Sequence, residues 1–222
     1  MSSECERLHK LFNSIPRKRF PFSEGEIPEN GIYILFEDGE NAHGVDRIVR
    51  VGTHTGKDQL KSRLKQHFIN ENKDRSIFRK NIGRALLNRD KDDYLQIWEI
   101  DFMKRKNREL FKNKRDIDKE KRTESKITSI LRKNFSFKFI TIEDQIERMG
   151  SKGLESPLIG TVAKCRLCKS SDNWLGKHSP KPKIRENGLW LVQHLKANSI
   201  TESDKETILN AIKTRNVNSF DS

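Results

Sequence analysis

The sequence predicts an α+β fold in which a small mixed or antiparallel sheet is flanked by helices, with helical and loop-rich additions. Short apolar runs that end at Gly or Asp-Gly turns occur at residues 31–36 and 48–51, as strands do. Stretches with apolar residues three or four positions apart, as in helices, follow these runs. The 222 residues are 33% hydrophobic and 35% charged, which suits one modest core under a heavily charged surface.

The first two strands are expected to form an antiparallel hairpin. Residues 31–36 are apolar and aromatic and are followed by Asp38-Gly39, while the β-branched run 48–51 ends at Gly52. The loop that joins them is polar. Residues 1–30 predict a short helix over 5–15, stopped by Pro16, and then an extended segment.

Two helices and a third strand are predicted next. Leu60, Leu64 and Phe68 lie four residues apart and predict a helix over 58–68. A second helix is expected over 77–87, and the alternating run 94–100 predicts a third strand.

Residues 101–134 are dense in charge, which favours a solvated helix or a mobile loop. The alternative is an insertion that grips a phosphate backbone. The period-two run 135–140 is a fourth strand candidate, and a helix over 154–163 would hold Pro157 in its first turn. Residues 188–192 fit either a last strand or a helix start, and a capping box at Thr201 opens a final helix over 201–213.

The chain carries a formal net charge of +13 and has a pI near 9.7, which favours a polyanionic partner such as nucleic acid. Three cysteines argue against a disulfide framework and fit a reducing cytosol. No stretch resembles a signal peptide or a membrane span. We therefore expect a cytoplasmic protein with no membrane partner.

Residues 31–67 resemble the GIY-YIG nuclease family. Gly31-Ile32-Tyr33 matches the first half of the family motif, and Arg50-Val51-Gly52 stands for the second half, with Arg50 where the family usually has tyrosine. Arg63 falls at the family's catalytic arginine and His67 at its histidine or tyrosine. The resemblance implies the GIY-YIG nuclease fold. It also implies a nuclease domain over 27–176 with a charged insertion at about 101–123, between a leader at 1–26 and a C-terminal extension at 177–222 that packs on the core.

The resemblance also implies roles for these side chains. Tyr33 would contact the attacking water or take its proton, although a free phenol with a pKa near 10 is a poor base unless a nearby cation lowers that value. His67 could share this role, since an unperturbed histidine titrates near pH 6.5. Arg63 would clamp the phosphate, because guanidinium binds two oxygens at once.

The family's metal-binding pattern, Leu-Glu-x-x-Leu-Ile, is matched at residues 154–159. Glu155 is therefore the expected ligand of Mg²⁺ or Mn²⁺, which take hard oxygen ligands. Glu124 also opens an amphipathic stretch, and the sequence does not exclude it as the ligand.

Further candidates complete the expected site. Because Arg50 replaces a tyrosine, His54 or Lys57 from the following turn could take over its function, with His54 preferred. Asn173 corresponds to an asparagine that the family carries after the glutamate helix. The expected nucleic-acid contacts are Arg50, Lys57, Lys61 and Lys65.

Cys165-x-x-Cys168, with His178 or His194, would supply half of a zinc site. A single CxxC pair is a weak signal for zinc.

These features predict a metal-dependent endonuclease that hydrolyses DNA, with restriction or defence as the expected role. Double-stranded DNA is the expected substrate, cut by a homodimer or by a monomer. Two other interpretations remain open: a nucleic-acid-binding module that has lost catalysis, which Arg50 favours, and an RNA nuclease.

Overall fold

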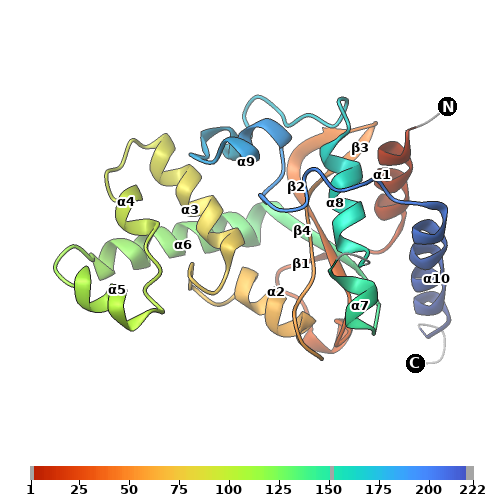
Figure 1. Cartoon of the computed structure of the whole chain (residues 1–222), viewed down its shortest axis with the longest axis horizontal. Coiled ribbons are helices and arrows are strands. Elements are labelled where there is room, and N and C mark those ends of the chain that lie inside the picture. The colour runs from red at the N-terminus through yellow and green to blue at the C-terminus, as the bar shows by residue number, and fades with distance from the viewer. Residues whose placement is uncertain (1–2, 151–152, 219–222) are drawn as a thin grey trace.

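A four-stranded antiparallel sheet organises the chain, and the computed structural model describes residues 3–150 and 153–218 of it. The strand order is β1-β4-β2-β3, so β2 lies between β4 and β3 (Figure 1). The strands are β1 (Lys18–Arg19), β2 (Ile32–Ala42), β3 (Val45–Gly52) and β4 (Phe135–Ile140). The predicted hairpin is β2–β3, and the predicted fourth strand is β4.

Helices cover both faces of this sheet, and a group of helices extends from one end of it (Figure 1). In chain order the α-helices are α1 (Glu4–Ser14), α2 (Leu60–Phe68), α3 (Ile77–Arg89), α4 (Leu95–Trp98), α5 (Arg105–Leu110), α6 (Ile117–Asn134), α7 (Gln145–Arg148), α8 (Glu155–Ala163), α9 (Pro182–Asn187) and α10 (Glu202–Asn218). Two 3₁₀ turns, η1 (Glu24–Glu26) and η2 (Leu175–His178), complete the list. The α+β class predicted from the sequence is confirmed.

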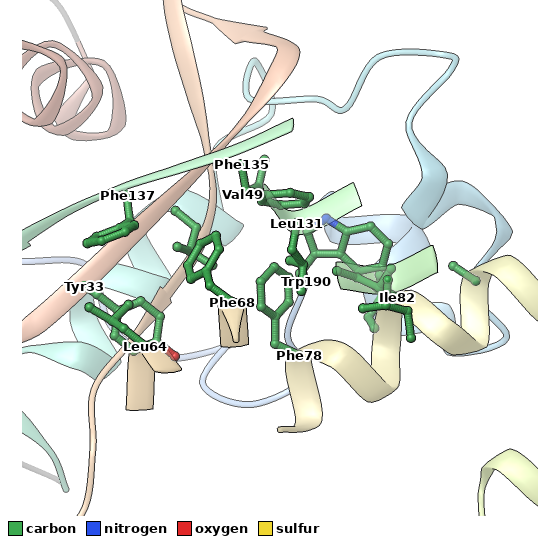
Figure 2. Packing of buried hydrophobic residues seen from close by; sticks show 14 of the residues in the cluster. Tyr33, Val49, Leu64, Phe68, Phe78, Ile82, Leu131, Phe135, Phe137 and Trp190 are labelled. Carbon is green, nitrogen blue, oxygen red and sulfur yellow. The ribbon is translucent and has the colours of Figure 1, made fainter. Parts of the chain in front are cut away.

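Successive residues of β2 point to opposite faces of the sheet and enter two separate hydrophobic cores. Tyr33 and Leu35 face a cluster built with α2, α3 and α6, whereas Ile32 and Ile34 face a cluster built with α1 and α8. Successive strand residues point to opposite faces, so a strand buried on both faces is apolar at nearly every position. Figure 2 shows the first cluster, with Tyr33 beside Leu64 at one end.

The predicted third strand over 94–100 is wrong. The segment contains the short helix α4 (Leu95–Trp98), with Tyr94 at its N-cap position. Tyr94 and Trp98 are four residues apart and therefore also fit a helical period. Trp98 packs against Gly83 of α3, where a Cβ would collide with the indole, and its Nε1 donates to the Lys80 carbonyl at 3.1 Å. Burial of this indole outweighs the strand preference of the local sequence.

The charge-dense block is helical rather than a mobile loop. α5 and α6 span most of it, and α6 presents Ile127, Thr128 and Leu131 to the core. Most of its charged residues stay outside, but Glu120 and Glu124 are buried. Residues 188–192 form neither a strand nor a helix. Instead the Trp190 amide donates to the Val49 carbonyl at 2.8 Å and its ring enters the first core.

Among the described residues, no helix combines the length and apolarity that crossing a membrane requires.

Candidate active site

A pocket of about 360 Å³ opens where β2 and β3 meet α2 and α8. Residues from distant parts of the chain line it, among them Tyr33, Arg50, Arg63 and Glu155. A second group of lining residues comes from the turn after β3 and from the C-terminal part of the chain: Thr53, His54, Met149 and Gln193.

Tyr33 reaches the pocket because its strand partner is a glycine. Tyr33 pairs with Gly52 across the β2–β3 register. A Cβ on residue 52 would lie 2.6 Å from Tyr33 Cζ, so only glycine leaves room for the ring. The phenol oxygen then lies 2.9 Å from His67 Nε2.

His67 lies fully buried on α2 and links two hydroxyl groups. Its Nδ1 lies 2.8 Å from Ser76 Oγ, and Ser76 caps α3 by accepting the Arg79 amide at 3.3 Å. Burial, reinforced by Arg63 and other nearby guanidinium groups, lowers the pKa of His67 well below its usual value. The imidazole is therefore neutral near pH 7, and the row Ser76–His67–Tyr33 can carry a proton to or from the pocket.

Two arginines supply positive charge to the same pocket. Arg50 Nε lies 3.5 Å from the Tyr33 oxygen, and Arg50 Nη1 donates to the Trp190 carbonyl, which fixes the guanidinium in the protein. Arg63 Nη1 donates to Gln66 Oε1 at 3.0 Å and to the Arg75 carbonyl at 3.2 Å. One side of the Arg63 guanidinium is thus held in place at the pocket wall.

Glu155 is the first residue of α8 and lies half-buried in the pocket wall. Its Oε1 accepts the Thr53 amide at 3.2 Å, which ties α8 to the turn after β3. Burial raises the pKa of Glu155, and Arg50 opposes that rise. This carboxylate is a hard oxygen donor in an open pocket and fits a magnesium or manganese ion.

Glu124 lies elsewhere. It forms a buried ion pair with Arg79, with Arg79 Nη2 2.6 Å from Glu124 Oε2. Arg79 also donates to the His67 carbonyl at 2.9 Å, so the pair braces the helix that carries His67. Glu124 is therefore bound to a structural partner and does not line the pocket.

A comparison with known protein families identifies the domain that contains this pocket. The sequence model of the GIY-YIG domain matches residues 6–218. The chain belongs to the GIY-YIG domain family. Its function is therefore of the nuclease type, and the suspected resemblance is confirmed. No curated protein and no solved structure matches the chain.

In this GIY-YIG domain, His54 lines the pocket but is held by an arginine that the sequence did not reveal. Arg148 Nη1 donates to His54 Nε2 at 2.6 Å, and burial together with the Arg148 charge lowers the pKa of His54. Lys57 is exposed on the same turn and is not part of the pocket wall.

The remaining predicted residues of the GIY-YIG site lie outside the pocket. Lys61 and Lys65 face outwards on α2 and pair with Glu29 and Glu24, at 2.7 and 3.0 Å. Asn173 is exposed next to Trp174 and is absent from the pocket lining.

Gln193 reaches the pocket from the late part of the chain instead. It follows Trp190, whose carbonyl holds Arg50. No sequence signal pointed to Gln193, because its position depends on a contact between residues 140 positions apart.

Proposed function

We propose that this GIY-YIG protein is a divalent-metal-dependent endonuclease that hydrolyses phosphodiester bonds of double-stranded DNA. The observation that carries the proposal is the convergence of Tyr33, Arg63 and Glu155 on one pocket, with His67 directly behind the phenol. A base, a phosphate clamp and a metal ligand are the groups that in-line hydrolysis of a phosphodiester requires.

Tyr33 and His67 act on the attacking water. The water proton passes to the Tyr33 oxygen while the phenol proton passes to His67 Nε2, 2.9 Å away. The water oxygen forms a bond to phosphorus, and the opposite P–O bond breaks. Ser76 holds the imidazole in the required orientation through Nδ1.

Arg63 and Arg50 stabilise negative charge on the scissile phosphate and on the Tyr33 oxygen. Arg63 lies on the pocket wall and binds the scissile phosphate through guanidinium hydrogen bonds. Arg50 faces the phenol oxygen, so charge that develops on Tyr33 meets a fixed cation. Arg50 thus takes a position next to the reacting groups, where the family usually places its second tyrosine.

Glu155 would hold the metal ion, Mg²⁺ or Mn²⁺, which takes hard oxygen ligands. A divalent ion at this position supplies Lewis-acid stabilisation of charge on the leaving oxygen. Glu155 must be ionised to bind a cation, and burial raises its pKa, so we expect metal binding to weaken as the pH falls.

The net charge of the chain supports nucleic acid as the substrate. The formal net charge of +13 favours binding to a long polyanion, with Lys57, Lys61 and Lys65 on the α2 side of the pocket as backbone contacts. We propose a role in restriction or defence, carried out in the cytoplasm by a homodimer. The N-terminal segment 1–26 and the C-terminal segment 177–222 then flank a nuclease domain over 27–176.

The second candidate is a module that binds nucleic acid without cutting it. Arg50 favours it, because the family's second tyrosine is missing from the site. The two candidates differ in a single readout, which is strand cleavage.

The deciding experiment incubates supercoiled plasmid and a structured RNA with the protein, with and without Mg²⁺. We expect Mg²⁺-dependent cleavage of plasmid, lost by at least about 100-fold in Tyr33→Phe and in Glu155→Gln. The matched controls are Tyr94→Phe, which changes the other tyrosine of the chain, and Glu186→Gln on the outer face of α9.

Each outcome selects one interpretation. Tight plasmid binding without cleavage by the unaltered protein would support the binding module. Cleavage of RNA alone would make the enzyme a ribonuclease. Full activity in Tyr33→Phe would remove Tyr33 from the mechanism.

A further inference from the structure

A cluster of thiols and imidazoles lies on the far side of the sheet from Tyr33. Cys5 and His9 come from α1, His43 from the turn between β2 and β3, and Cys168 from the segment after α8. Their ligand atoms all lie within 4.8 Å of one another, and three of the four residues are buried. None of the four lines the active-site pocket.

The spacing of these atoms fits a tetrahedral zinc site. Zn–S bonds of about 2.3 Å and Zn–N bonds of about 2.0–2.1 Å at tetrahedral angles place sulfur and nitrogen about 3.6 Å apart. Cys168 Sγ lies 3.5 Å from His9 Nε2. This pair of atoms is therefore already at the separation of two ligands of one ion, and the four atoms together lie close enough to reach the same ion.

One nitrogen of the His9 ring has the partner typical of a metal-binding histidine. Its Nδ1 donates to the Cys5 carbonyl at 2.8 Å, a contact that commonly fixes such a ring. Nε2 is therefore the acceptor nitrogen: it accepts the Ile48 amide at 3.1 Å and lies 3.5 Å from Cys168 Sγ. A cation bound at Nε2 would displace the Ile48 amide from this lone pair.

His43 lies in the two-residue turn between β2 and β3. Its φ angle is 55° and that of the following Gly44 is 76°, so both central residues of this hairpin turn are left-handed. Glycine, asparagine, aspartate and histidine are the residues enriched in this conformation. The turn places the imidazole beside the thiols of two other segments.

Cys165 is a fifth donor beside the cluster. Its Sγ lies 3.5 Å from His43 Nε2, so thiol and imidazole reach the same corner of the site. Structural zinc accepts four ligands, so one of the two fills that corner. The four mutually close atoms favour His43. Neither His178 nor His194 belongs to the cluster, so the CxxC pair draws its partners from the N-terminal half of the chain.

We propose that Cys5, His9, His43 and Cys168 bind one structural Zn²⁺ ion. Two thiolates neutralise the charge of the ion, so a buried site of this composition carries no net charge. The ion would join α1, the β2–β3 turn and the segment after α8, three parts of the chain that the catalytic pocket does not hold together. Its role is to stabilise the fold, and it is separate from the Glu155 site.

The test measures zinc in the full-length protein, purified without a histidine tag. We expect about one zinc per chain by mass spectrometry of the metal, and X-ray absorption showing two sulfur and two nitrogen ligands at the distances above. A strong chelator should lower Tm of the unaltered protein by several degrees. Replacement of zinc by Co²⁺ should give a thiolate-to-cobalt charge-transfer band.

The variants form a matched set. Cys168→Ser and His43→Ala should lose the zinc, whereas Cys165→Ser, which changes the other cysteine of the same CxxC pair, should keep it. Glu155→Gln should also keep it, which separates this ion from the catalytic metal. Retention by His43→Ala and loss by Cys165→Ser would support the zinc site but overturn the assignment of His43.

Two results would overturn the proposal itself. One is a chain that contains no zinc, even when purified from zinc-supplemented cells, and gives no cobalt–thiolate band. The other is a disulfide among the three cysteines in the freshly isolated protein. Because zinc content and the cobalt band are read on the unaltered chain, a variant that fails to fold leaves the test intact.

Discussion

Glu37 is a buried carboxylate whose two strongest partners are indoles. Trp174 Nε1 and Trp190 Nε1 both donate to its Oε2 at 2.8 Å, while burial raises the pKa of Glu37 to about 7. The folded protein therefore holds a proton on Glu37 between about pH 4.3 and 7 that the unfolded chain has released. The free energy of unfolding falls over this range as the pH rises.

The loss of unfolding free energy amounts to about 4 kcal/mol and stays constant above pH 7. Glu37→Gln cannot ionise, so we expect its stability to lack this decline and to exceed that of the unaltered protein at pH 8. Urea unfolding from pH 5 to 8 measures both slopes, with Glu186→Gln as the exposed control. Parallel curves for Glu37→Gln and the unaltered protein would contradict the assignment.

Ser76 is a positioning residue for His67. Ser76→Ala removes the partner of His67 Nδ1 and the N-cap of α3. We expect kcat to fall about tenfold with little change in KM. The free energy of unfolding should fall by about 1 kcal/mol because the cap is lost. Asp116→Ala removes the cap of α6, which accepts the Lys119 amide at 2.8 Å, and serves as the control. Equal losses of kcat in both variants would reduce Ser76 to a capping role.

At the scale of elements, the β2–β3 pair positions the Tyr33 phenol, which we propose as catalytic. Gly52→Ala puts a methyl group into the space of the Tyr33 ring, so we expect the ring to move and cleavage to fall by at least about tenfold. Gly25→Ala, at an exposed position with only Ser23 Oγ nearby, is the matched control and should keep full activity. An active Gly52→Ala would show that the position of the phenol does not limit the rate.

Periodicity predicted most elements but not their tertiary roles. The β2–β3 hairpin, α2, α3 and β4 follow from apolar spacing in windows of six to thirteen residues. The run 94–100 was misread because Tyr94 and Trp98 suit a strand face and a helix face equally. The two-residue strand β1 leaves no local signal, since pairing with β4 alone defines it.

The site was predictable as far as it follows the family motif. Motif order predicts Tyr33, Arg63, His67 and Glu155. The pocket brings three of them together, and His67 lies behind Tyr33. Arg148 and Gln193 were missed because each reaches the site through a tertiary contact that no local pattern encodes. Asn173 was predicted from the family's late asparagine, and in the structure it is exposed and absent from the pocket lining.

At the scale of the whole molecule, the excess of basic residues should govern DNA binding. If binding neutralises about four phosphates, affinity should fall about 100-fold between 50 and 200 mM salt. Fluorescence anisotropy with a labelled duplex and the inactive Glu155→Gln protein measures this slope without cleavage. An affinity independent of salt would show that the net charge of +13 does not face the DNA.

The four side chains proposed as catalytic span more than one hundred positions of the sequence, and they are proposed to work as one unit. Groups that act in a single step lose activity non-additively when they are removed together. The direct measurement is a cleavage-rate cycle with Tyr33→Phe, Glu155→Gln and the double variant. We predict that the double variant is about as slow as the slower single variant. A loss equal to the product of the two single losses would contradict a shared catalytic centre.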